Sequence, residues 1–140
     1  MSHRSRARLI LMLAGIPIPA AVSHAQAAPA SPTRVVIPLA GDRRLAGLFA
    51  ERIRFLPGDR GRPHTHSGEL HVTVVRGRIF LNWGTRFDTS GARLLAPGDF
   101  VVLPAGRAHF EWVDQPAEIH VQGVGPVSTA YVDSLAKEVR

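Results

Sequence analysis

The sequence predicts an all-β fold in a single domain, built as a sandwich or a closed barrel. At 140 residues the chain has the size of one ordinary domain. Its 13 glycines and 11 prolines make a composition typical of turn-rich β proteins. Short runs of β-forming residues recur with turn signals between them. Strands this short bury a core only when sheets pack or close on one another.

The predicted strands lie between clear turn signals. In chain order they span 34–39, 47–55, 69–76, 78–83, 99–104, 107–113 and 117–124. The turns that separate them are rich in glycine and proline, as in Pro57-Gly58-Asp59, Arg76-Gly77, Pro97-Gly98-Asp99 and Pro104-Ala105-Gly106. Residues 130–139 have a short helical pattern, so we expect a helix there.

The N-terminus has the pattern of an export signal. Arg4, Arg6 and Arg8 precede an apolar run over 9–22, and the small residues Ala25-Gln26-Ala27 follow. The apolar run has 14 residues and includes two prolines, whereas a transmembrane helix needs about 20 residues. We therefore expect a signal peptide at 1–27, no stable membrane anchor, and a periplasmic or secreted protein.

The rest of the chain divides into a linker at 28–33 and a β domain at 34–140. Without the signal peptide, 14 basic side chains face 11 acidic ones, a net charge of +3. This charge is too small and too scattered to indicate nucleic-acid binding. The sequence contains no cysteine, which excludes disulfides, cysteine-based zinc sites and a cysteine nucleophile.

Three histidines have a spacing that suits a metal site. His64 and His66 are two residues apart, so on a strand they share a face. Imidazole is the commonest metal ligand in proteins. His109 follows the turn Pro104-Ala105-Gly106, which could bring a distant strand beside the pair. The alternative is that His64 and His66 are polar surface residues next to a turn.

These segments resemble the two conserved motifs of the cupin superfamily. Residues 58–77 resemble the first motif and 98–109 the second, with 20 residues between them. The matching positions are Gly58, His64, His66 and Gly77 in the first motif, and Gly98, Pro104, Gly106 and His109 in the second. The similarity covers about 35–132, and the segment 123–132 looks like the tail of small single-domain bacterial cupins.

The resemblance implies a cupin jelly-roll β-barrel of the RmlC-like type. It implies that His64, His66 and His109 point into the barrel and bind one divalent metal ion, whether Fe, Zn, Ni, Mn or Cu. It also implies a small-molecule ligand and a possible homodimer.

The sequence departs from the cupin motifs at two positions. Leu70 stands where cupins have a glutamate ligand, and Val113 stands at the asparagine position of the second motif. Glu69 and His71 flank Leu70 but face away from the histidines on a regular strand. A β-bulge would be needed to turn Glu69 or His71 inward as a fourth ligand.

Catalytic candidates are weak in this sequence. Glu111 shares a strand face with His109, and His120 could line the cavity from the last long strand. The leading hypothesis is a metal-dependent enzyme, either dioxygenase-like or isomerase- or lyase-like. The alternatives are a non-catalytic cupin that binds a metal or small molecule, and a cupin that has lost its metal. Fold alone does not choose among these reactions.

Overall fold

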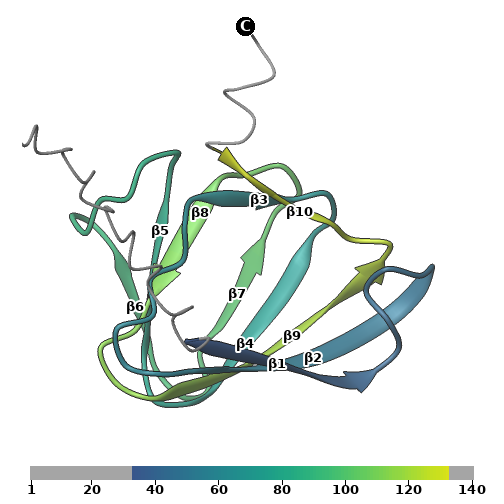
Figure 1. The fold of residues 1–140 in the computed structure, drawn as a ribbon, viewed down its shortest axis with the longest axis horizontal. Helices are drawn as coiled ribbons and strands as arrows, with labels where there is room; N and C mark the ends of the chain where they lie inside the picture. The colour runs from purple at the N-terminus through teal and green to yellow at the C-terminus, as the bar shows by residue number, and fades with distance from the viewer. Residues whose placement is uncertain (1–32, 133–140) are drawn as a thin grey trace, which may run out of the picture. The chain divides into compact units, whose positions relative to one another are not determined.

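The computed structural model describes residues 33–132, which form a two-layered β structure (Figure 1). Ten strands in this range pair into two five-stranded antiparallel sheets. The predicted signal peptide, nearly all of the predicted linker and residues 133–140 lie outside the described range, so the predicted domain limits stay predictions. Within residues 33–132, no helix is long and apolar enough to cross a membrane.

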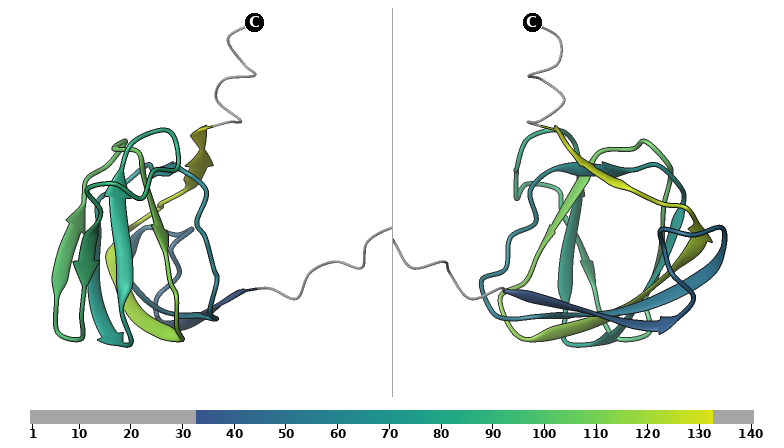
Figure 2. Two further views of the ribbon diagram at one scale, coloured as in Figure 1. Left: turned by 90° about the vertical axis from the view of Figure 1, so that its left-hand side faces the viewer. Right: turned by 45° about the vertical axis from the view of Figure 1, so that its right-hand side comes forward.

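The strand order shows that the sheets are built from segments far apart in the chain. The first sheet contains, in spatial order, β1 (Arg34–Ala40), β2 (Gly47–Phe55), β9 (Ala117–Gly125), β4 (Leu70–Arg76) and β7 (Phe100–Leu103). The second contains β10 (Thr129–Tyr131), β3 (His64–His66), β8 (His109–Trp112), β5 (Ile79–Trp83) and β6 (Arg93–Leu95). The two views in Figure 2 show these strands arranged around a common interior. The structure thus confirms the predicted all-β jelly-roll fold.

Alternation along the strands defines the interior. On β9, Ala117, Ile119 and Val121 are buried, while the residues between them point outward. β4 follows the same pattern, with Leu70 and Val72 buried. Burying each such aliphatic side chain contributes about 1.5–3 kcal/mol. The inner faces of the two sheets therefore supply the core and the walls of the interior.

Gly77 occupies a turn position that requires glycine. Its φ is 72°, a left-handed conformation that glycine adopts without strain. A Cβ atom at this position would lie 2.2 Å from the carbonyl oxygen of Pro116. A side chain at residue 77 would therefore push apart the two turns that meet at this end of the barrel.

The structure corrects the element predictions at three strands and at the start of the predicted helix. β3, β6 and β10 are not among the predicted strands, and β10 occupies Thr129–Tyr131, where the sequence suggested the start of a helix. β10 pairs with β3, placing Thr129 opposite His66 and Tyr131 opposite His64. Threonine and tyrosine suit a strand, and pairing with β3 outweighs the local helical pattern. Residues 133–139 of the predicted helix lie outside the described range.

Candidate metal centre

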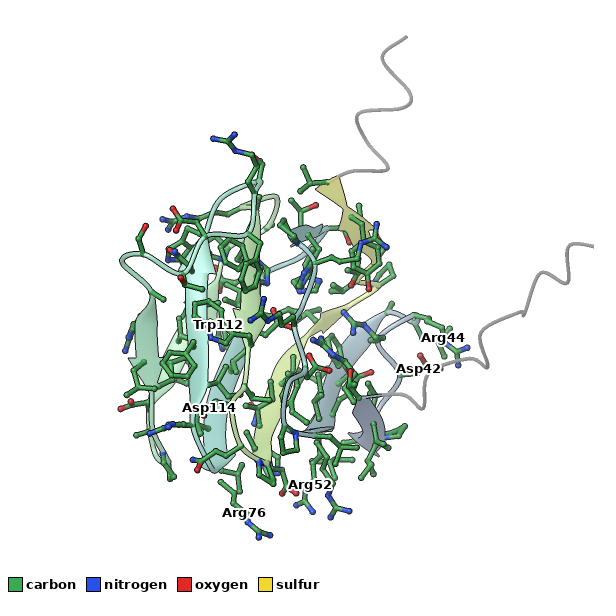
Figure 3. The ribbon with its side chains drawn as sticks, turned by 60° about the vertical axis from the view of Figure 1, so that its left-hand side comes forward. Asp42, Arg44, Arg52, Arg76, Trp112 and Asp114 are labelled. Carbon is green, nitrogen blue, oxygen red and sulfur yellow. The ribbon has the colours of Figure 1, made fainter. Side chains whose placement is uncertain are left out.

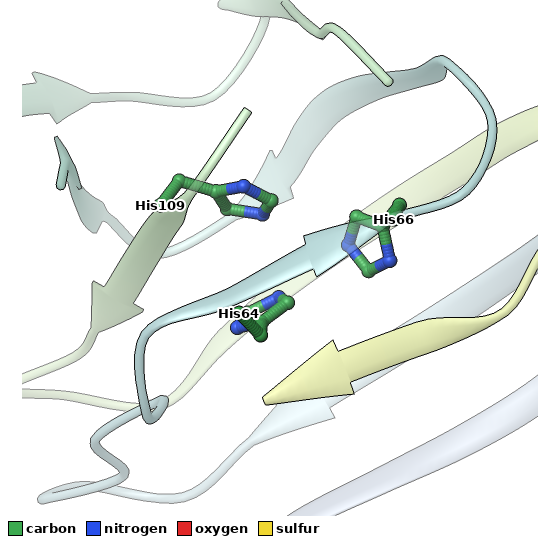
Figure 4. A group of neighbouring side chains, drawn as sticks. All are labelled: His64, His66 and His109. Carbon is green, nitrogen blue, oxygen red and sulfur yellow. The ribbon is translucent and has the colours of Figure 1, made fainter. Parts of the chain in front are cut away.

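The structure brings His64, His66 and His109 together in the interior (Figure 4). Their ligand nitrogens all lie within 4.8 Å of one another, close enough for the three side chains to hold one ion. His64 and His66 come from β3, and His109 begins β8 directly opposite His64. Each side chain is buried, and His109 is 1% exposed.

The turn before β8 holds the two histidine segments in register. Gly106 has a φ of 72°, and its N–H donates a hydrogen bond to the carbonyl of His66 (2.8 Å). This bond ties the second motif to the first and places His109 beside His64. The predicted role of the Pro104–Gly106 turn is confirmed.

Backbone contacts determine which nitrogen carries the hydrogen in two of the imidazole rings. Nδ1 of His64 lies 2.7 Å from the carbonyl oxygen of Arg62, and Nδ1 of His109 lies 3.0 Å from that of Arg107. A carbonyl oxygen only accepts, so each Nδ1 carries the hydrogen and each Nε2 offers a lone pair. Nδ1 of His66 is paired with Oγ1 of Thr129 at 3.0 Å. Such contacts orient imidazoles for metal binding.

Burial favours the neutral imidazoles of His66 and His109. It is the largest cause that lowers the pKa of His66 to about 3, followed by the charges of His64, His109 and Arg43. Burial also lowers the pKa of His109, opposed in part by its hydrogen bond to the Arg107 carbonyl. Metal ions bind neutral imidazole, so these ligands lose no proton when an ion arrives at neutral pH.

The three histidines line a cavity of about 360 Å³ between the sheets. Aliphatic side chains from both sheets form much of its wall, among them Val72, Ile79 and Val121. Charged side chains also line it: Arg34, Arg43, Arg60, Arg62, Asp59 and Glu111. A small organic molecule of mixed polarity therefore suits this space.

Leu70 lines the same cavity as the three histidines, as its strand parity predicted. It is 2% exposed and lies opposite Gly123 of β9, whose missing side chain leaves room for it. In the described residues the candidate metal cluster thus contains three imidazoles and no carboxylate. This donor set fits a borderline divalent ion such as Zn²⁺, Ni²⁺, Cu²⁺ or Fe²⁺ better than a hard ion.

Comparisons with known proteins agree with this geometry. The structure resembles that of a sugar phosphate isomerase of the cupin superfamily from Silicibacter pomeroyi, with a TM-score of 0.54, 25% identity, and coverage of 71% of this chain and 65% of that one. The fold is that of a cupin. Salicylate 1,2-dioxygenase from Pseudoaminobacter salicylatoxidans has a TM-score of 0.59 at 16% identity, covering 74% of this chain and 30% of that one.

Sequence comparison relates this cupin to plant proteins. It is 31% identical over 67 residues to germin-like protein subfamily T member 2 of Arabidopsis thaliana. The matched segment covers 47% of this chain and 30% of that protein. The chain spans about a third or less of the length of the curated relatives it matches. No family model matches the sequence.

The cupin barrel excludes the two predicted fourth ligands. Glu69 and His71 lie away from the histidine cluster, and Nε2 of His71 pairs with Oε1 of Glu69 at 2.9 Å. Their side chains are 56% and 47% exposed. The register of β4 is regular from Leu70 to Val74, so no bulge turns His71 inward, and Glu69 lies just before the strand. The expectation of a fourth ligand at Glu69 or His71 is wrong for this reason.

Of the two catalytic candidates, one faces the cavity between the sheets and the other faces outward. Glu111 lines the cavity, and its Oε1 accepts a hydrogen bond from Nη1 of Arg34 at 2.8 Å. His120 lies on the outer face of β9, with its Nε2 3.1 Å from Nε of Arg52. The expectation that His120 lines the cavity is wrong, because the buried positions of β9 are the odd-numbered ones.

Several cavity residues were missed by sequence reasoning. Asp59 is 2% exposed, and its carboxylate accepts hydrogen bonds from Arg34 and Thr33. Tyr131 lines the cavity with its ring 5.9 Å from that of His64. The partners of Asp59 are about 25 residues away in the chain, so no local pattern marks it. The Thr129-x-Tyr131 alternation was a usable signal for a strand at this position.

Proposed function

We propose that this chain is an exported cupin enzyme that holds one divalent metal ion through His64, His66 and His109. The observation that carries the proposal is the convergence of three buried imidazoles at the wall of a cavity of about 360 Å³. With three protein ligands, an ion keeps coordination positions for water or a substrate, as catalytic metal sites do. A purely structural zinc site usually has four protein ligands.

The metal, when bound, would act as a Lewis acid or activate a water molecule or oxygen. The chain's own residues would orient the substrate and move protons. Glu111 is the better candidate for proton transfer, because it faces the cavity and Arg34 holds it in place. Arg34 also hydrogen-bonds Asp59, so the position of the guanidinium is fixed from two sides.

Two reaction classes are candidates for this site: oxygen chemistry, and isomerisation or elimination. The structural neighbours include a sugar phosphate isomerase and a salicylate dioxygenase. These two reaction classes are therefore the first to test. A second candidate is a cupin that binds a metal or a small molecule without turnover. The leucine at residue 70 favours this alternative, since it removes a potential anionic ligand.

The test is the metal content of untagged protein after dialysis against mixed divalent ions. We expect about one ion per chain, removable by a chelator, as in three-histidine metal sites. Protein that stays metal-free under these conditions would overturn the proposed metal site. Oxygen uptake and product analysis with a panel of small molecules then separate an enzyme from a binding protein.

Export gives a second prediction. If residues 1–27 form a signal peptide, protein recovered outside the cytoplasm begins near Ala28. N-terminal sequencing of periplasmic or culture-medium protein measures this directly. Intact Met1 on most of that material would contradict the proposal. The expectations of a homodimer and of no nucleic-acid partner stay predictions.

A further inference from the structure

Arg43 lines the cavity and has a buried nitrogen without a hydrogen-bond partner among the described residues. It lies in the loop between β1 and β2 and lines the cavity. Its Nη1 lies 3.3 Å from Oε2 of the buried Glu51, but within residues 33–132 its Nη2 is buried without a hydrogen-bond partner. An N–H in this state loses its hydration without compensation, which is unfavourable. A ligand that accepts a hydrogen bond from Nη2 would remove this penalty.

The backbone holds Arg43 firmly in this position. The N–H of Val127 donates a hydrogen bond to the carbonyl of Arg43 at 2.7 Å. The guanidinium lies 5.7 Å from the ring centroid of Phe49. Arg43 lines the same cavity as His64, His66 and His109. Arg43 is therefore placed to meet a ligand that also reaches the metal centre.

The charges of the cavity favour an anion. Four arginines line it against two carboxylates, those of Asp59 and Glu111. Both carboxylates are already engaged by Arg34. The three imidazoles bring no negative charge, so a bound divalent ion would leave its charge uncompensated. An anionic ligand would offset both the excess of arginine and the charge of the ion.

We propose that the cavity takes a small carboxylate and that Nη2 of Arg43 anchors its carboxyl group. This names the substrate class of the proposed metalloenzyme and rests on that function. A guanidinium matches the planar geometry of a carboxylate. A phosphate has more oxygens to satisfy, whereas Nη2 of Arg43 is the one buried side-chain nitrogen without a partner among the described residues.

The experiment titrates propionate into Co²⁺-loaded protein and follows the visible spectrum of the cobalt and the heat of binding. Arg43→Gln is expected to weaken propionate binding about 10-fold or more, as for loss of a charge-assisted hydrogen bond. Arg44→Gln is the matched control, because it makes the same change at the next residue. Arg44 is 81% exposed, pairs with Asp42 and lies at the edge of the molecule (Figure 3). Equal weakening in the two variants, or none in Arg43→Gln, would overturn the anchor.

Glu51→Gln gives a test of the opposite sign. Removing the Glu51 charge leaves Arg43 in place with its positive charge unshared, so propionate should bind several-fold more tightly. If Arg43 serves only to neutralise Glu51, this variant leaves propionate affinity unchanged and the proposal fails. Because Arg43→Gln leaves Glu51 unpaired, the double variant with Glu51→Gln provides a charge-matched protein if the single variant does not fold.

Two further measurements separate this inference from the proposed metal site. Metal content is measured on every variant before the titration. Normal cobalt content with propionate binding insensitive to Arg43 rejects the carboxylate anchor alone. Absence of cobalt in the wild type rejects the metal site, and propionate is then titrated into the metal-free protein by calorimetry. Inorganic phosphate that binds more tightly than propionate would overturn the choice of carboxylate.

Discussion

Replacing His109 by alanine is expected to empty the metal centre. His109 is the most buried of the three histidines, and its ring lies 4.4 Å from that of His64 and 5.1 Å from that of His66. Without it, two imidazoles on one short strand remain, and two ligands hold a divalent ion poorly. Metal affinity should fall at least as far as the 10–100-fold that loss of a supporting contact typically causes. Equilibrium dialysis with elemental analysis measures this loss.

His120→Ala is the matched control for that experiment. It removes the same ring from the outer face of the first sheet, where His120 contacts Arg52. This variant should keep the metal content of the wild type. Thermal unfolding of the metal-free proteins checks that His109→Ala still folds. A folded His109→Ala protein with unchanged metal content would show that the three histidines are not the site.

The second large effect is expected from Leu70→Glu. The side chain at residue 70 faces the cavity that the three histidines line, so a glutamate there would offer the ion an anionic oxygen. Affinity should rise most for Mn²⁺, which prefers oxygen ligands, and the gap between Mn²⁺ and Zn²⁺ should narrow. The metal-free variant should lose about 2–4 kcal/mol of stability, because a carboxyl group replaces a buried leucine. Competition titrations and thermal unfolding with and without metal measure the two effects.

Leu70→Gln separates charge from shape in this prediction. Glutamine has nearly the same size as glutamate and offers an oxygen without a negative charge. It should raise Mn²⁺ affinity far less than Leu70→Glu does. If Leu70→Glu leaves Mn²⁺ affinity unchanged or weaker, residue 70 does not reach the ion.

Periodicity and motif spacing predicted most of the barrel and the histidine cluster. β2 and β9 alternate over nine residues each, and such long regular strands are the easiest to recognise. The same alternation placed apolar residues at 117, 119 and 121, and this pattern already argued that His120 points outward. On a regular strand, the parity of a position decides which way its side chain points, whether or not the side chain is polar.

The parts that were not predicted depend on contacts distant in the chain. β10 is three residues long and is defined by its pairing with β3, more than 60 residues earlier. The ion pair of Arg34 with Glu111 joins residues 77 positions apart. Arg43 gives no signal in the sequence, since its importance comes from one nitrogen left unpaired in the interior. Such features follow from packing and not from local pattern.

The order in which the histidine cluster is completed has a consequence for folding. β3 shares one register pair with β8, and its other edge is covered by β10, the last strand in the described range. The contact between Thr129 and His66 closes a loop of 63 residues, and long loops of this kind form slowly. We therefore expect the histidine cluster to be completed late in folding. An ion that binds the finished cluster stabilises the folded barrel over the unfolded chain, so metal binding would favour the protein in which β10 is paired with β3.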